Sequence, residues 1–148
     1  MGEASESKAI YLMDLASGKV TQLSGSEGLF SPRWSPDGRY IAALSLNMYK
    51  LMLYDTATKS WRTLASQSSA EPVWSHNQKF LYFTDYVQKN RTIYRISVPN
   101  GTVEKVVDLA DVHSAVDYNF AGLMPDDEPL VNARIFTTNI YAMQLGEK

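Results

Sequence analysis

Cysteine is absent from the 148 residues of this sequence, and histidine is scarce. Without cysteine the chain can form no disulfide bond, no thiolate nucleophile and no zinc site built on sulfur. A catalytic triad would have to use His76 or His113, because the sequence has 2 histidines in all. No nucleophile motif accompanies either of them, so we interpret both as structural or solvent-exposed and expect a chain that is not an enzyme.

A concentration of positive charge is also missing. The formal net charge is -2, and the lysines and arginines are scattered singly along the chain. Proteins that bind the phosphate backbone gather such residues, so we expect no direct nucleic-acid binding. No apolar run approaches the roughly 18 residues of a spanning helix, so we expect no membrane insertion. The polar residues 1–7 lack the pattern of a secretory signal and suggest a truncated or engineered start.

Metal-ligating residues are clustered at one place, Asp126-Asp127-Glu128. Carboxylate oxygens suit hard cations, but the ligand spacing of a calcium loop is missing here. The cluster lies in a segment with the composition of a turn, so we interpret the three residues as solvated turn residues. The sequence therefore predicts no metal site and no cofactor.

What the sequence does contain is an internal repeat of two motifs. The motif that begins at Ile10 (IYLMD) recurs at Leu51, which is 41 positions later, and then at Ile93 and Ile140 after a further 42 and 47 positions. The motif Arg33 to Ile41 (RWSPDGRYI) recurs 40 residues later as Val73 to Leu81, with a weaker copy at residues 122–130. Two motifs that keep one period of about 40 to 45 residues predict an all-β array of four-stranded propeller blades.

Each unit divides into strands by its local chemistry. In the first complete unit we expect strands at residues 31–34, 40–46, 51–55 and 61–64. Farther along the chain, residues 107–113 are expected to form at most a short turn. Trp34 and Trp74 recur at one repeat position, so we interpret them as core residues between blades rather than as ligand-stacking platforms. Tyr11, Tyr94 and Tyr141 also recur in register and are interpreted in the same way. The structural repeat positions are Asp14, Trp34, Pro36, Asp37, Gly38, Asp55, Trp74 and Gly101.

The segment Ser35 to Ala42 (SPDGRYIA), with the motif at Ile10, resembles the TolB-type Pro-Asp β-propeller repeat family. The resemblance covers nearly everything from Lys8 to Leu145. The closing stretch, residues 122–143, is similar to the last blade of propellers in large bacterial regulators, where a DNA-binding winged helix or a protein kinase domain precedes the propeller. The location stays unknown: it would be the bacterial cytoplasm or periplasm, depending on the parent protein. Two turns depart from the family pattern at residues 76–78 and at Asp127, so we expect them to differ in shape.

The repeat divides the chain into four units. We expect a half blade with a third and a fourth strand at 8–28, complete blades at 29–70 and 71–115, and a three-stranded blade at 116–148. Closed rings use about four to eight blades, so the chain alone makes an incomplete ring. Either missing blades of a parent chain complete the ring, or copies of this chain assemble. Exposed blade faces and strand edges favour a homo-oligomer, most simply a dimer with three blades per subunit.

Function is less clearly specified than architecture. We expect a non-catalytic binding or sensory module with a protein or peptide ligand, in the C-terminal part of a larger bacterial regulatory protein. One alternative is the gating propeller of a prolyl oligopeptidase-type serine peptidase. Another is an excised or engineered fragment that self-assembles into a ring. The sequence identifies no ligand-binding residue.

Overall fold

The computed structural model describes residues 8–85, 87, 92–109 and 117–134, and every regular element in this part of the chain is a β-strand. The prediction of an all-β fold is confirmed. His113, Tyr141 and the strand expected at residues 140–145 lie outside the described residues. The strands are β1 (Tyr11–Met13), β2 (Val20–Gln22), β3 (Leu29–Trp34), β4 (Tyr40–Ser45), β5 (Leu51–Asp55), β6 (Ser60–Ala65), β7 (Ala70–Trp74), β8 (Phe80–Thr84), β9 (Thr92–Ser97), β10 (Val103–Asp108), β11 (Asp117–Leu123) and β12 (Pro129–Arg134).

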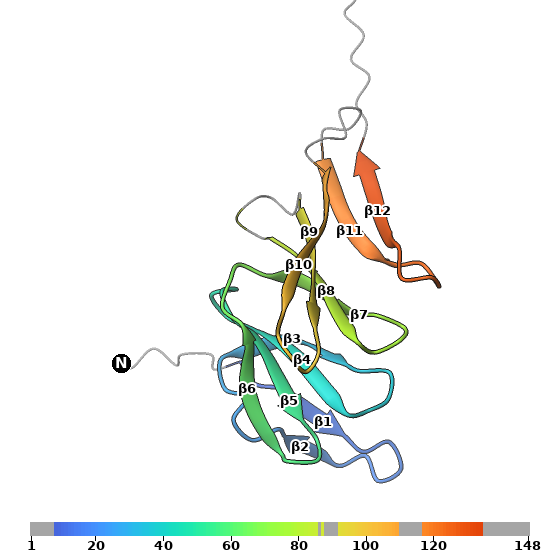
Figure 1. Ribbon diagram of the computed structural model, residues 1–148. Helices are drawn as coiled ribbons and strands as arrows, with labels where there is room; N and C mark the ends of the chain where they lie inside the picture. Colours follow the sequence, from blue (N-terminus) through green and yellow to red (C-terminus); the bar gives the residue numbers. More distant parts are fainter. Residues whose placement is uncertain (1–7, 86, 88–91, 110–116, 135–148) are drawn as a thin grey trace, which may run out of the picture.

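The strands form four antiparallel sheets that follow one another along the chain (Figure 1). Two sheets have four strands in sequential order, β3 to β6 and β7 to β10, and they are complete blades. The hairpins β1–β2 and β11–β12 lie at opposite ends of the row. The row does not close on itself, so the described part of the chain is an incomplete propeller. It also contains no helix long and apolar enough to cross a membrane.

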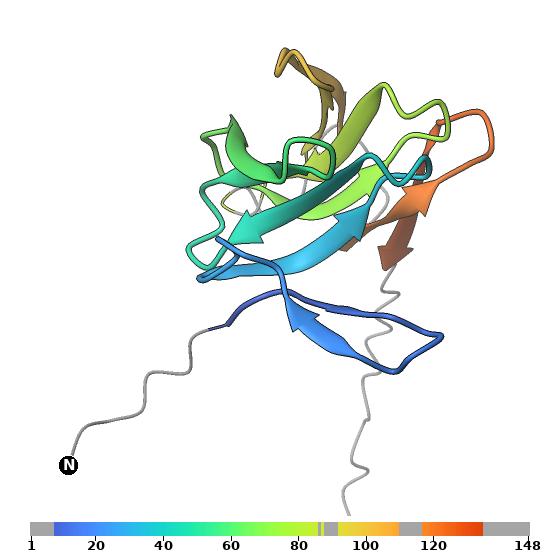
Figure 2. The same ribbon diagram turned by 90° about the horizontal axis from the view of Figure 1, so that it is seen from below.

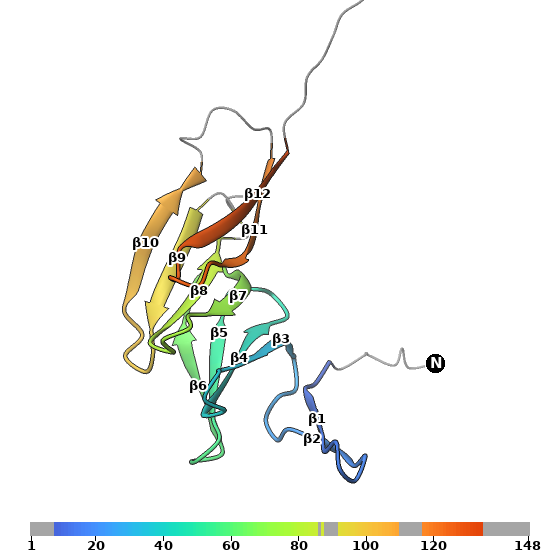
Figure 3. The ribbon, with the colours of Figure 1, turned by 90° about the vertical axis from the view of Figure 1, so that its right-hand side faces the viewer.

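The first strands of three units, β3, β7 and β11, lie on the inner side of the row. β7 lies against β3 and against β11, so these three strands are neighbours although each belongs to a different sheet. Figure 3 shows the row from the side, with β1–β2 at the end next to β3. The arrangement matches a propeller, in which the first strand of every blade faces the central axis.

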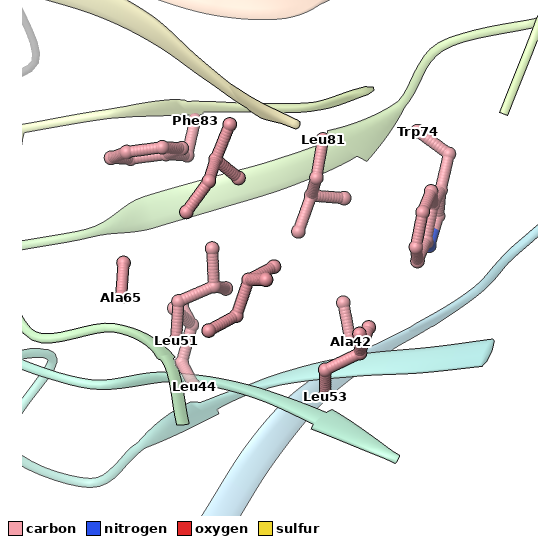
Figure 4. Packing of buried hydrophobic residues seen from close by; sticks show 10 residues of the cluster. Ala42, Leu44, Leu51, Leu53, Ala65, Trp74, Leu81 and Phe83 are labelled. Atoms are coloured by element: carbon pink, nitrogen blue, oxygen red, sulfur yellow. The ribbon is translucent and has the colours of Figure 1, made fainter. Parts of the chain in front are cut away.

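The hydrophobic core lies between the sheets. Leu44 and Leu53 of the first complete blade face Leu81 and Phe83 of the second, and all four side chains are buried (Figure 4). A second cluster joins the hairpin β1–β2 to the first complete blade, and a third joins the second complete blade to β11–β12. Residues on both faces of β4 are therefore buried, which explains its continuous apolar sequence.

The start of the segment expected to form at most a short turn, residues 107–113, is part of a strand instead. Val107 and Asp108 belong to β10, where they pair with Ile93 and Thr92, rather than to a turn. A β-bulge after Lys105 lets the strand resume pairing. A bulge adds one unpaired residue without breaking the strand, and sequence periodicity alone does not locate it.

The turns between first and second strands are less varied than expected. Gly38 and Gln78 both have positive φ, at 74° and 64°, and each turn is closed by a hydrogen bond from the backbone N–H of Ser35 or Ser75. The expected difference in shape at residues 76–78 is therefore wrong, because Gln78 adopts the left-handed conformation that glycine adopts in the other copy. The third turn does differ: the N–H of Met124 donates to the carbonyl of Glu128, which makes this turn one residue shorter.

Candidate functional site

Trp74 illustrates how one blade packs on the next. Its indole Nε1 donates a hydrogen bond of 2.9 Å to the carbonyl oxygen of Arg33 on β3. Its ring stacks on Tyr40 of β4, with ring centroids 6.5 Å apart, and belongs to the same buried cluster as Ala42. Trp74 is 8% exposed. The first and second strands of the preceding blade therefore cover this tryptophan.

Trp34 occupies the same repeat position but is 52% exposed. The interpretation of Trp34 as a core residue between blades is therefore wrong, and so is that of Tyr11, which is 59% exposed. Met52 and Tyr94, the counterparts of Tyr11, pack toward the preceding blade, and no described strand precedes β1. For Trp34 the reason is the half blade before β3. Its described strands, β1 and β2, correspond to third and fourth strands, so the two strands that would cover Trp34 are not among them.

Two adjoining grooves lie where the first and second strands of the half blade would cover Trp34. One runs along residues 8–11 and 29–32, and the other lies between β1, Pro32, Trp34 and Ile41. The hairpin β1–β2 is the last described element on this side of the molecule (Figure 2). We call this surface the open face; it comprises Ile10, Tyr11, Leu12, Met13, Pro32, Trp34 and Ile41.

The open face is apolar and lies beside a strand edge. Met13 is 62% exposed, and no residue between Ile10 and Met13 is charged. Among the described strands β1 pairs with β2 alone, whereas the corresponding strands β5 and β9 also pair with β4 and β8. Its second edge can therefore pair with an extended polypeptide, and the apolar side chains beside it can bury those of the added strand.

The acidic cluster differs from its predicted role at one position. The side chain of Asp127 is 16% exposed, so it is not a solvated turn residue. Its Oδ1 lies 2.8 Å from Nδ1 of His76 and accepts a hydrogen bond from the His76 backbone N–H. Burial by itself raises the pKa of Asp127, but these contacts with His76 outweigh it and the pKa lies below its ordinary value. The pair joins the turns of two successive blades.

Metal ligands do not gather elsewhere in the described ranges either. No group of three or more histidine, aspartate or glutamate side chains there could hold an ion. Asp37 is a predicted repeat position, and its carboxylate stabilises its own turn. It accepts hydrogen bonds from the Ser35 hydroxyl and the Arg39 backbone N–H. Both contacts lower the pKa of Asp37. Pro36 precedes it in the same turn.

The repeated aspartates at the ends of the third strands stabilise hairpins. Asp55 forms a two-point ion pair with Arg39, whose Nε and Nη2 lie 3.0 and 2.9 Å from the carboxylate oxygens. This hydrogen bonding lowers the pKa of Asp55 to about 2. Asp14 accepts hydrogen bonds from the backbone N–H and hydroxyl of Ser17, and its pKa is lowered for that reason. Gly101 lies in the corresponding turn of the second complete blade with φ of 81°.

Glu71 was not among the residues singled out from the sequence, although it lies on the inner strand β7. Burial raises the pKa of its carboxyl group, and its Oε2 lies 3.5 Å from the hydroxyl of Thr84. Glu71 and Ser31 occupy the same repeat position, each with φ of 52° and each before a proline at a β-bulge. The repeated residue–Pro pair, Ser31-Pro32 and Glu71-Pro72, was the available signal.

Comparison with known proteins identifies the fold alone. No protein-family model and no curated protein matches this sequence. The solved structure of TolB from Acinetobacter baumannii is similar, with a TM-score of 0.68 and 22% identity over 91% of this chain. An oligogalacturonate lyase from Vibrio parahaemolyticus has a TM-score of 0.54 and 16% identity over 68% of this chain. The chain spans 34% of the length of each of these two proteins. It therefore has a TolB-like β-propeller fold and corresponds to about a third of either neighbour.

Proposed function

We propose that this chain is a non-catalytic propeller segment that binds polypeptide through the open face. The observation that carries the proposal is the exposure of Tyr11, Met13 and Trp34 along two adjoining grooves. Contiguous apolar side chains on the surface of a folded domain mark a site of protein interaction. The unpaired edge of β1 adds backbone donors and acceptors, so an extended peptide with apolar side chains is the class of ligand that fits.

The setting that we propose is a larger bacterial regulatory protein in which this segment is the binding or sensory part. The coverage of a third of TolB supports a piece of a ring rather than a whole one. A regulatory parent predicts a winged helix or a kinase domain in the reading frame upstream of this segment. Because a lyase has a similar fold, absence of catalysis needs a direct test: the chain alone should leave peptide, ester and oligogalacturonate substrates unchanged.

Peptide binding can be measured on the purified chain. An array of extended 12-residue peptides with alternating apolar residues serves as the probe, followed by isothermal titration with the strongest binders. The double variant Met13→Ser, Trp34→Ser should lose binding, because it removes apolar surface from both sides of the groove. The control is Val106→Ser on β10, which removes an exposed apolar side chain away from the open face. Equal binding by the double variant and the wild type would disprove this site.

A further inference from the structure

The chain carries at its C-terminal end the two strands that its N-terminal half blade needs. β1 and β2 correspond to the third and fourth strands of a blade, whereas β11 and β12 correspond to the first and second. The two hairpins lie at opposite ends of the row, with both complete blades between them (Figure 1). One chain therefore cannot bring its own hairpins together, but two copies can exchange them.

The geometry points to a composite blade in which β11–β12 of a second copy fills the open face of the first. This inference rests on the proposed function, because it names the polypeptide that the open face takes. Exchange at both ends by a two-fold axis gives two composite blades in addition to two complete blades from each copy. The result is a closed ring of six blades, within the range of known propellers.

The complete blades specify the register of this pairing. In the first complete blade Ala42 pairs with Leu53 on the neighbouring strand. On the inner strand of the first complete blade Arg33 pairs with Ala42, and on β11 Gly122 pairs with Leu130. Gly122 holds the repeat position of Arg33, so Leu130 corresponds to Ala42. Because the turns after β1 and β5 close in the same way, at Asp14 and Asp55, Leu12 corresponds to Leu53. Leu130 of one copy should therefore lie opposite Leu12 of the other.

The same correspondence supplies what Trp34 lacks. Ala42 belongs to the buried cluster that contains Trp74, and the carbonyl of Arg33 accepts the Trp74 indole hydrogen bond. In the composite blade Leu130 packs on Trp34, and the carbonyl of Gly122 accepts its indole N–H. Trp34 and Leu130 are 52% and 48% exposed in the single chain. Each exposed side chain is thus covered by the other.

Residues 140–145 carry the same motif as β1 and lie outside the described residues; a strand formed there would compete for the edge of β12. Pairing with that strand gives a blade of three strands. Pairing with β1 brings β2 with it, which gives the four strands of a complete blade and also covers the open face. The composite blade therefore buries more apolar surface and leaves fewer strand edges.

One contact in this register is unfavourable. Glu128 occupies the position of Tyr40, which pairs with Asp55, so Glu128 of one copy lies opposite Asp14 of the other. Like charges directly opposite each other weaken a strand pair. Glu128→Lys should therefore strengthen association several-fold, since it creates an opposite-charge pair at both composite blades. Glu104→Lys on β10 makes the same charge change away from the contact and should not strengthen association, although it also breaks the ion pair between Glu104 and Arg95 within its own blade.

The experiment combines mass in solution with directed cross-linking of the full chain. Sedimentation equilibrium should give a dimer at micromolar concentration, and Trp34→Ser or Leu130→Ser should weaken it at least tenfold. Both side chains are exposed in the single chain, so circular dichroism should show an unchanged fold. Val106→Ser is the control for loss of an exposed apolar side chain.

Because the sequence has no cysteine, introduced cysteines report the register without background. Leu12→Cys with Leu130→Cys should form a dimer that reducing agent separates, whereas Leu12→Cys with Val131→Cys should not, because neighbouring strand residues point to opposite faces. A monomer without cross-links, or a dimer insensitive to Trp34→Ser and Leu130→Ser, would overturn the composite blade. If peptides then still bind the open face, the proposed function stands; if they do not, it fails as well.

Discussion

The indole Nε1 of Trp74 donates a hydrogen bond of 2.9 Å to the carbonyl oxygen of Arg33, so a side chain of one blade bonds to the inner strand of the blade before it. The same tryptophan stacks on Tyr40 of that preceding blade. Both contacts come from strands that precede Trp74 by one repeat. The packing of successive blades is therefore directional: each blade depends on the first two strands of its predecessor.

Substitution of the tryptophan in each copy of the motif should change the stability of the protein by different amounts. Trp74→Phe should lower the free energy of unfolding by about 2 kcal/mol, because it removes the part-buried hydrogen bond to the carbonyl of Arg33 and reduces the packing of a buried side chain. Trp34→Phe should change it by less than about 0.5 kcal/mol, because the ring is half exposed. Chemical denaturation at concentrations where light scattering gives a monomer measures both values. Equal losses would contradict the asymmetry between the two sites.

The difference in burial between Trp74 and Trp34 separates the features that follow from local sequence from those that do not. The Trp-Ser motif, its period and the glycine turns all follow from local chemistry, and these features were sufficient to predict the all-β propeller array. Burial of Trp34 was not predictable in this way, because it depends on strands 1 and 2 of a neighbouring unit rather than on the motif itself. Likewise, the contact between Asp127 and His76 joins turns 51 positions apart, and a local pattern carries no information about it.

Gln78 should be a site at which glycine stabilises the fold. Its φ of 64° is unfavourable for a residue with a side chain, while Gly38 has φ of 74° in the same turn of the preceding blade. Gln78→Gly should raise the free energy of unfolding by about 0.5 to 1 kcal/mol, since relief of strain exceeds the added entropy of the unfolded chain. The reciprocal variant Gly38→Gln should lower it by about 1 to 2 kcal/mol. Thermal unfolding of both variants tests the pair, and a destabilised Gln78→Gly protein would refute the argument.

The ion pair between Arg39 and Asp55 should make stability depend on pH in acid. Hydrogen bonding, chiefly from Arg39 and also from the backbone N–H groups of Ala57 and Thr58, lowers the pKa of Asp55 from 3.8 to about 2 in the folded protein, so the folded state favours the ionised carboxylate. The pair thus stabilises the fold above pH 3.8, and this contribution is lost as the pH falls toward 2. The melting temperatures of wild type and Asp55→Asn should differ at pH 7 and converge near pH 2. A difference that stays constant across this range would exclude the ion pair as its cause.

Gly18 and Gly101 provide a matched pair for the turns between third and fourth strands. They occupy the same position, with φ of 69° and 81°, and each backbone N–H donates to a carbonyl four residues earlier at 2.8 Å. A Cβ added to Gly18 would meet nothing within 4 Å, whereas one at Gly101 would lie 3.2 Å from the carbonyl oxygen of Leu64. Gly18→Ala should therefore cost about 1 kcal/mol from backbone strain alone.

Gly101→Ala adds a steric conflict between successive blades to the same backbone strain. Leu64 lies on β6, the outer strand of the first complete blade, so its carbonyl can move away only if that blade shifts relative to the next. We expect a loss of about 2 to 3 kcal/mol, as for other insertions into a packed interface. Urea unfolding of the two variants in parallel measures the difference. Equal losses would mean that the turn of the second blade can move away from Leu64 without cost, and would contradict the steric argument.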